Sequence, residues 1–260
     1  MTYVEELFSL QDKVAVVIGG SGVLGGQMAV ALGRAGARVA IIYHSNKEGA
    51  LEHQKLIEDH NGEALICQAN ASEKSDVERA RDAIIDQWGR VDILVNAPGI
   101  NSTTPVLEID ESEWHKILDV NLQGIFLACQ VFGALMIDQG DGGSIINISS
   151  ASSERPLSKV FTYSISKAGV NNLTRFLARE WAPQNIRVNA LAPGFFPAEQ
   201  NRKILTEERR DAIFGHTPMN RYGEPEELDG AIIYLASANA ASFVTGEVLF
   251  VDGGYMAMTI

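Results

Sequence analysis

Short apolar runs alternate with longer helical patterns from residue 13 onward. The runs are rich in Val, Ile, Leu and Ala, and nearly all of their positions are apolar, as in strands buried on both faces. We predict seven strands over residues 14–18, 38–43, 64–68, 91–95, 144–148, 186–191 and 248–251. We predict helices over residues 23–35, 47–60, 76–88, 111–137 and 161–181. This alternation indicates βαβ units and a parallel sheet.

The order of these elements favours a single α/β domain, a doubly wound parallel sheet of seven strands with helices on both faces. The chain has 260 residues, which is enough for one large domain and short for two. Residues 195–223 are polar, weakly helical and punctuated by prolines. We expect this segment to form a lid over a site and not to join the sheet.

The charge balance narrows the range of partners. The chain carries 33 acidic and 21 basic residues, a formal net charge of −12. Because this charge repels phosphate backbones and anionic lipids, we expect neither nucleic acid nor a membrane surface as a partner. No apolar run reaches about 18 residues, so we predict no membrane span, and residues 1–10 lack the pattern of a signal peptide.

The two cysteines, Cys67 and Cys129, lie in a predicted strand and a predicted helix. Their spacing is not that of metal ligands, and we predict no metal site. We interpret both as buried thiols of a reducing compartment, and we expect a cytoplasmic protein.

A glycine-rich segment stands where the first predicted strand turns into the first predicted helix. Glycines let the backbone approach a pyrophosphate, whose charge is attracted by the helix N-terminus. The agreement of strand, loop and helix predicts that a dinucleotide binds here. The residues expected to contact it are Gly19, Ser21, Gly22, Val23, Leu24 and Gly25.

The residues that follow the second predicted strand bear on the choice between NAD and NADP. A fold that selects NAD commonly places an acidic residue there, on the ribose 2′-hydroxyl. This chain has no carboxylate at that place, and Ser45, Asn46 and Lys47 could hold a 2′-phosphate. This favours NADP, with NAD left open. The alternative role of the same residues is a Ser-x-x-Glu capping box, from Ser45 to Glu48, that only starts a helix.

Tyr163 and Lys167 lie four residues apart in a predicted helix and therefore on one face of it. An ammonium beneath a phenol favours the ionised phenol, so we expect the pKa of Tyr163 to be lowered. Such a pair can exchange protons at neutral pH. The alternative interpretation is ordinary amphipathic patterning.

The glycine segment and the Tyr163–Lys167 pair together resemble the short-chain dehydrogenase/reductase family, and the likeness covers residues 13–254. The resemblance implies a Rossmann-type fold in which Tyr163 is the acid-base group and Lys167 supports it and bonds the nicotinamide ribose. It also implies that Ser150, thirteen residues before Tyr163, holds the substrate oxygen. Asn121, on the long predicted helix, would support a proton path beside Lys167.

Further cofactor contacts are implied by the same resemblance. The chain departs from the family pattern at Val23, which stands at the middle glycine position, and at Ala97 and Pro98, where the family has Asn and Ala. A tight turn after the fourth strand is the alternative role of residues 96–98. The contacts implied beyond the glycine segment, besides Tyr163 and Lys167, are Asn70, Ala71, Asn96, Ala97, Pro98, Pro193, Gly194 and Phe196.

The activity implied by the resemblance is hydride transfer between the nicotinamide of NADP, or NAD, and a small alcohol/carbonyl substrate. The polar lid favours a sugar acid or a polyol as that substrate. A 3-oxoacyl-[acyl-carrier-protein] reductase-like enzyme and a non-catalytic nucleotide-sensing protein of the same fold remain alternatives. The resemblance further implies a homotetramer packed through the helices at residues 111–137 and 161–181.

Overall fold

The computed structural model describes residues 2–197 and 206–258. Within these ranges seven strands form one parallel sheet in the order β3-β2-β1-β4-β5-β6-β7. The predicted fold class and all seven strands are confirmed, with ends that shift by one or two residues. The strands are β1 (Val14–Ile18), β2 (Arg38–Tyr43), β3 (Ala64–Gln68), β4 (Ile93–Asn96), β5 (Gly143–Ile148), β6 (Ile186–Pro193) and β7 (Val248–Val251).

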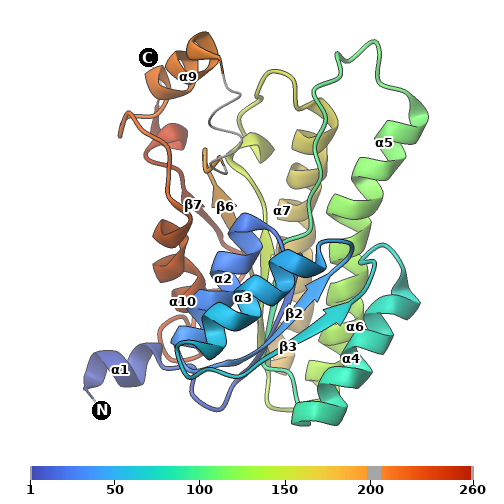
Figure 1. The fold of residues 1–260 in the computed structure, drawn as a ribbon, viewed down its shortest axis with the longest axis vertical. Coiled ribbons are helices and arrows are strands. Elements are labelled where there is room, and N and C mark those ends of the chain that lie inside the picture. Colours follow the sequence, from blue (N-terminus) through green and yellow to red (C-terminus); the bar gives the residue numbers. More distant parts are fainter. Residues whose placement is uncertain (1, 198–205, 259–260) are drawn as a thin grey trace.

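Helices cover both faces of the sheet (Figure 1). One face packs against α2 (Val23–Arg34), α3 (Lys47–Glu58) and α10 (Asp229–Ala236), and the other packs against α4 (Lys74–Trp88), α6 (Gly124–Gln139) and α7 (Phe161–Trp181). Alternate side chains of β1 enter the two cores: Ala15 and Val17 join the first, and Val14, Val16 and Ile18 join the second. Burial on both faces explains why the central strands are mostly apolar.

The single long helix predicted over residues 111–137 is not α-helical throughout. It consists of α5 (Glu111–Leu118), a π-helical segment (Asp119–Gln123) and α6, which follow one another directly. The stretch Glu111–Gln139 is long and apolar enough to cross a membrane by length and composition alone. Half of its apolar window is buried inside the domain, where α6 packs against α4, so it serves as a core helix.

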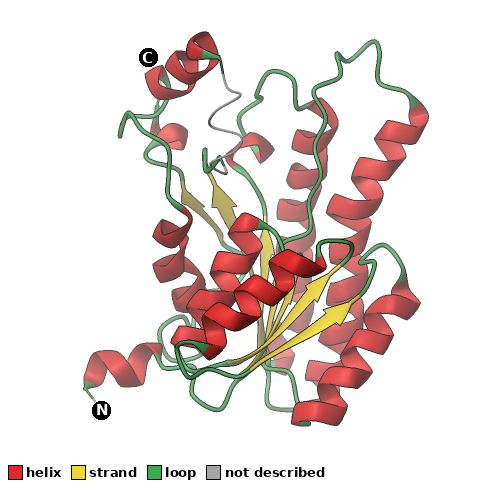
Figure 2. Cartoon of the chain, viewed as in Figure 1, coloured by secondary structure: helices red, strands yellow, loops and turns green. Residues whose placement is uncertain are grey.

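Three helices were not predicted individually. The first, α1 (Tyr3–Phe8), begins at a capping box in which Thr2 and Glu5 satisfy each other's backbone N–H groups. The second, α9 (Glu207–Gly215), lies within the expected lid, and the third is α10. Figure 2 shows α1 at the end of the molecule opposite α9.

The two cysteines are unpaired thiols. Cys129 is fully buried on α6, and burial raises the pKa of its thiol to about 12. Cys67 on β3 is only half-buried, contrary to the prediction, because β3 is the edge strand of the sheet.

Candidate active site

The carboxyl ends of the parallel strands bring most of the predicted site residues to one edge of the sheet. The glycine segment follows β1, Asn96 ends β4, Ser150 follows β5, and Pro193 ends β6. The strand order reverses between β1 and β4. Ligands of open α/β sheets bind outside the carboxyl ends of the strands at such a reversal.

The glycine segment forms a cradle closed on one side and open on the other. A Cβ on Gly19, whose φ is +78°, would lie 2.7 Å from the Ala97 carbonyl oxygen, and a Cβ on Gly25 would overlap the Gly19 carbonyl oxygen. At Gly22 the nearest atom would be 3.5 Å away. Gly22 is the N-cap of α2 and contributes no side-chain cap, so the first N–H groups of the helix, beginning at the exposed Val23, are left for a phosphate. These residues fit a dinucleotide.

Asn46 connects the glycine segment to α3. Its Oδ1 accepts a hydrogen bond from the Gly49 N–H at 3.0 Å, and its Nδ2 donates to the Ser21 carbonyl at 3.0 Å. The capping box predicted from Ser45 is therefore wrong, because Asn46 is the N-cap of α3. Ser45 and Lys47 are exposed, and their side chains have no hydrogen-bond or ion-pair partner in the part of the chain that the structure describes. Both are available to a 2′-phosphate.

Asn70 lies just after β3 in a turn held by its own polar groups. Its Oδ1 accepts from the Ser72 N–H at 3.1 Å, and its backbone N–H donates to Asp76 at 3.0 Å. Its side-chain NH₂ has no partner among residues 2–197 and 206–258, which leaves a donor for an adenine ring. Ala71 is buried, and a Cβ on Gly124 of α6 would lie 3.3 Å from its methyl group.

Asn96 faces the protein core. Its Nδ2 donates to Asn147 Oδ1 at 2.8 Å and to Cys129 Sγ at 3.3 Å, and Asn147 in turn donates to Thr174 Oγ1 at 2.9 Å. These contacts join β4 and β5 to α6 and α7 beneath the site. Asn96 thus supports the turn that presents Ala97 to the glycine segment.

Lys167 is buried on α7, with 3% of its surface exposed. Its Nζ donates to the Ile148 carbonyl at 2.8 Å and to the Pro98 carbonyl at 3.5 Å, and lies 5.6 Å from the centre of the Tyr163 ring. Burial lowers the pKa of its ammonium to about 8. The lysine thus bridges the ends of β4 and β5 directly beside the tyrosine.

Tyr163 has a raised pKa, so the predicted lowering is wrong for the protein alone. Burial raises the pKa of the phenol, and a hydrogen bond with Ser150 lowers it by a smaller amount. The ammonium of Lys167 is itself desolvated and bound to two carbonyl groups, and it does not offset the burial of the phenol.

Ser150, and not its neighbour Ser149, is the serine that meets Tyr163. The Ser150 Oγ also accepts hydrogen bonds from the backbone N–H and the hydroxyl of Ser152, at 3.2 and 3.1 Å. The Ser149 hydroxyl points into the protein and donates to Asn171 Oδ1 at 2.5 Å. The structure therefore shows which of the two neighbouring serines bonds the tyrosine, a choice that the sequence alone leaves open.

Asn121 lies in the π-helical segment and is fully buried. Its Oδ1 accepts from the Ile100 N–H at 2.8 Å, while its Nδ2 donates to the Ile100 carbonyl at 2.9 Å and to Ser166 Oγ at 3.1 Å. The oxygen and the nitrogen of the Asn121 amide thus both bond the backbone of Ile100, in the loop after β4. A Cβ on Gly99 would lie 3.7 Å from Lys167 Nζ and 3.9 Å from Asn121 Oδ1, so the two groups border the same space.

The segment after β6 crosses the open end of the site. Gly194 packs closely on β7, because a Cβ there would lie 2.7 Å from the Asp252 Cα, and its N–H donates to the Val251 carbonyl at 3.0 Å. The Phe196 ring covers Gly223, where a Cβ would overlap it. Pro193 and Gly194 are therefore held in place beside the site by β7.

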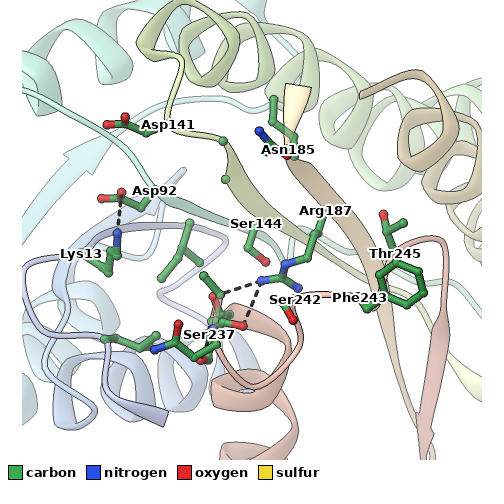
Figure 3. A pocket seen from close by; sticks show the side chains of 18 of the residues that line it. Lys13, Asp92, Asp141, Ser144, Asn185, Arg187, Ser237, Ser242, Phe243 and Thr245 are labelled. Atoms are coloured by element: carbon green, nitrogen blue, oxygen red, sulfur yellow. Dashed lines mark hydrogen bonds and ion pairs between the residues drawn. The ribbon is translucent and has the colours of Figure 1, made fainter. Parts of the chain in front are cut away.

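A cavity of about 780 Å³ lies at the opposite edge of the sheet. Lys13, Asp92, Ser144 and Arg187, which line it, stand at the amino ends of four strands (Figure 3). Lys13 pairs with Asp92 at 3.5 Å, and Arg187 donates to the Leu235 carbonyl at 2.9 Å. This cavity is separated by the sheet from Tyr163 and Ser150, and we assign the chemistry to the carboxyl edge.

Comparison with known proteins identifies the family. The sequence model of the family described as Enoyl-(Acyl carrier protein) reductase matches residues 21–256. An oxidoreductase of Bacillus subtilis named UxuB is 37% identical over 96% of this chain and 96% of its own. The chain belongs to the short-chain dehydrogenase/reductase family. The predicted family and the predicted class of enzyme, an oxidoreductase, are both confirmed.

Other members of the short-chain dehydrogenase/reductase family also match this chain over nearly its whole length. The 3beta-hydroxysteroid dehydrogenase 1 of Eggerthella lenta is 41% identical over 94% of both chains. The crystal structure of a gluconate 5-dehydrogenase from Burkholderia cenocepacia, in complex with NADP and tartrate, superposes with a TM-score of 0.92. It is 34% identical and covers 99% of this chain and 100% of its own.

Several groups that shape this short-chain dehydrogenase/reductase site carry no signal in the sequence. The carbonyl groups of Ile148 and Pro98 hold Lys167, and the backbone of Ile100 holds Asn121. Backbone groups are the same in every residue type, so only the fold shows which ones are used. Ser166, which bonds Asn121, lies on the same helix as Tyr163 and could have been found from its spacing.

Proposed function

We propose that this chain is an NADP-dependent dehydrogenase or reductase of a small, polar alcohol/carbonyl pair. The observation that carries the proposal is the convergence of Ser150, Tyr163 and Lys167 beside the open glycine cradle at the carboxyl edge of the sheet. NADP would supply the hydride acceptor or donor at its nicotinamide ring.

Tyr163 is the proposed acid-base group. In carbonyl reduction its hydroxyl gives a proton to the substrate oxygen, and in alcohol oxidation the phenolate takes that proton back. Ser150, which already bonds the phenol, holds the same oxygen and fixes its position. Preorganised donors in a site shielded from water stabilise the developing charge more than they do in bulk water. Lys167 stabilises the tyrosinate once the proton has left.

Asn121 is proposed to support a proton path and to position the loop after β4. Its two bonds to Ile100 fix that loop, whose residue Pro98 accepts from Lys167. The gap opposite Gly99, bordered by Lys167 and Asn121, is where a water molecule could relay a proton to the surface.

NADP is the proposed cofactor on two grounds. Ser45 and Lys47 are exposed at the end of β2, where a 2′-phosphate would lie, and the chain has no carboxylate at that place. The gluconate 5-dehydrogenase of similar structure was crystallised with NADP. The proposed contacts to the rest of the cofactor are Gly19, Gly22, Val23, Leu24, Gly25, Asn70, Pro193, Gly194 and Phe196.

A sugar acid or a polyol is the proposed substrate. The gluconate 5-dehydrogenase supports this class, and the polar character of residues 195–223 is compatible with it. The second candidate is a 3-oxoacyl-[acyl-carrier-protein] reductase-like activity, and the description of the matching family model supports an acyl-carrier-protein substrate.

A substrate panel tests the proposal. Sugar acids, polyols, their keto forms and β-ketoacyl thioesters are offered with NADPH, NADP, NADH and NAD, and the absorbance of the reduced nicotinamide is followed. We expect turnover of at least one hydroxylated substrate, faster with NADP(H). Tyr163→Phe is expected to bind NADPH normally and to lose turnover. A wild-type protein that binds NADPH but turns over nothing in the panel would be a nucleotide-sensing protein instead.

A homotetramer packed through α5, α6 and α7 is also proposed, in the cytoplasm. Large apolar side chains stand exposed on these helices, with Phe126 43%, Ile165 38% and Phe176 64% exposed. Exposed apolar side chains on these helices are compatible with a protein interface. Light scattering of the purified protein tests this, and a monomeric mass would contradict it.

A further inference from the structure

Two arginines belong to segments that contact each other, the loop between β5 and α7 and the helix α9. Arg155 lies on the loop between β5 and α7, and Arg209 lies on α9 in the lid. The inference drawn from them rests on the proposed function, because it concerns which substrate the same site accepts.

Arg155 is held close to the catalytic serine by its backbone. The turn that starts at Ser150 closes with the Ser153 N–H donating to the Ser150 carbonyl at 3.0 Å, and the Arg155 N–H donates to the Ala151 carbonyl at 3.2 Å. The side chain of Arg155 is exposed and has no hydrogen bond or ion pair with any residue in the ranges 2–197 and 206–258. Its guanidinium is therefore free to bind a ligand.

Arg209 reaches from α9 across to the same loop. Its Nη1 donates to the Ser158 hydroxyl at 2.5 Å, and its Nη2 donates to the Ser158 carbonyl at 3.3 Å. Neither bond neutralises the guanidinium, and no carboxylate pairs with it in the described part of the chain. By contrast, Arg210, the next residue on α9, forms an ion pair with Asp211 at 3.2 Å.

A third polar group, Tyr255, lies just after β7. It follows β7 in a turn fixed by Asp252, and its ring stands edge-on to Phe195 with the ring centres 5.5 Å apart. Burial raises the pKa of its phenol, while the charges of Arg155 and Arg209 both act to lower it. Both guanidinium groups therefore act on the same phenol.

With a formal charge of −12, the surface as a whole repels anions. Two arginines without a carboxylate partner in the described residues nevertheless meet at one loop, since Arg155 lies on the loop that follows Ser150 and Arg209 bonds Ser158 of the same loop. A guanidinium offers a fork of N–H donors that matches a carboxylate, and a phenol can add a third donor. A neutral substrate would leave both charges without a partner.

We propose that Arg155 and Arg209, assisted by the Tyr255 hydroxyl, bind a carboxylate of the substrate while its reacting carbon lies at Ser150 and Tyr163. The substrate class is thereby a hydroxy acid or keto acid, and the two arginines determine the preference for it over a neutral polyol.

The test compares two six-carbon compounds that differ at one end. D-gluconate carries a carboxylate where D-glucitol carries a hydroxymethyl group, and both offer the same kinds of secondary alcohol. Binding of each to the complex of the enzyme with NADPH is measured by calorimetry, and oxidation of each is measured with NADP. The variants are Arg155→Ala and Arg209→Ala, with Arg210→Ala as the matched control on the same helix. Ser158→Ala removes the side-chain anchor of Arg209 and keeps its charge.

The wild type is expected to bind and oxidise D-gluconate in preference to D-glucitol. Arg155→Ala and Arg209→Ala are each expected to raise the Kd and KM for D-gluconate about tenfold or more, the usual effect of losing a charged hydrogen bond. The values for D-glucitol should stay within about twofold, and Arg210→Ala and Ser158→Ala should retain the preference for D-gluconate.

Two results would overturn the inference. One is a wild type that does not prefer D-gluconate in binding or in turnover. The other is an equal loss for both compounds in the arginine variants, which would indicate a structural role for these residues. If D-gluconate binds in an arginine-dependent manner but neither compound is oxidised, the carboxylate site stands and the proposed hydride-transfer function fails.

Discussion

Replacing one glycine of the cradle by alanine separates the folding role of this loop from its role in cofactor binding. Gly25 is buried in the first turn of α2, and a methyl group there would overlap the Gly19 carbonyl oxygen and approach the Ala97 methyl group to 3.3 Å. Gly22 is exposed, has a φ of −84°, and has no atom within 3.4 Å of the same position. The two sites thus carry the same substitution in opposite environments.

The size of each effect follows from these contacts. Overlap with a backbone oxygen in a packed loop costs about 2 kcal/mol, and the better helix propensity of alanine returns roughly 0.5–1 kcal/mol at Gly25. The remaining 1–1.5 kcal/mol corresponds to a fall in Tm of about 2–6 °C for a domain of this size. Gly22→Ala costs only about 0.5 kcal/mol as an N-cap change, but its methyl group enters the space left for the pyrophosphate.

Thermal melting without cofactor and NADPH titration by nicotinamide fluorescence measure the two effects separately. We expect Gly25→Ala to melt earlier than the wild type, and Gly22→Ala to melt nearly normally while binding NADPH about tenfold or more weakly. A Gly25→Ala protein as stable as the wild type would refute the packing argument. A Gly22→Ala protein with unchanged NADPH affinity would refute the assignment of the cradle to the cofactor.

Four further predictions concern the residues around the cradle and the catalytic edge. Because burial lowers the pKa of Lys167 to about 8 from 10.5, the unfolded chain binds more protons between these values. The wild type should therefore gain stability relative to Lys167→Met as the pH rises from 8 to 10.5, by up to roughly 1.4 kcal/mol per unit in urea titrations. Parallel pH profiles would contradict this. Ser150→Ala should lose most turnover with little change in Tm, whereas Ser149→Ala should lose stability, and the reverse pattern would reassign the two serines. Asn46→Ala should cost about 1 kcal/mol of stability through the lost N-cap. Lys47→Ala should raise the KM for NADPH and leave that for NADH unchanged, and equal changes for both would rule out a 2′-phosphate contact.

Five of the strands, β1, β2, β4, β5 and β6, are almost wholly buried, and burial on both faces makes their sequences short, mostly apolar runs that could be predicted. The short apolar runs at β1 and β5 admit few alternatives once they are followed by helices. Helix α1 carries a Thr2–Glu5 capping box that could have been noticed. Helix α10 is hydrophobic at six of its eight positions, so its sequence resembles that of a buried strand as much as that of a helix.

The local geometry of the site could be predicted only in part. The spacing of Ser150, Tyr163 and Lys167 is a property of the sequence, but the direction of the Tyr163 pKa shift depends on burial, which the spacing does not show. Asn121, in the π-helical segment, likewise bonds Ile100, 21 residues away, and the sequence does not show that pairing. Such features depend on which backbone groups meet in the folded protein.

The central claim is that this chain transfers a hydride between NADPH and a carbonyl carbon, with Tyr163 as the acid-base group. Following the hydride itself tests this claim most directly. NADPH dideuterated at C4 of the nicotinamide is incubated with a carbonyl substrate that the wild type reduces, and the alcohol product is analysed by mass spectrometry. We expect a product one mass unit heavier, with deuterium on the carbinol carbon, and no such product above background from Tyr163→Phe that binds NADPH normally. Product without deuterium, or deuterated product formed by Tyr163→Phe at the wild-type rate, would contradict it.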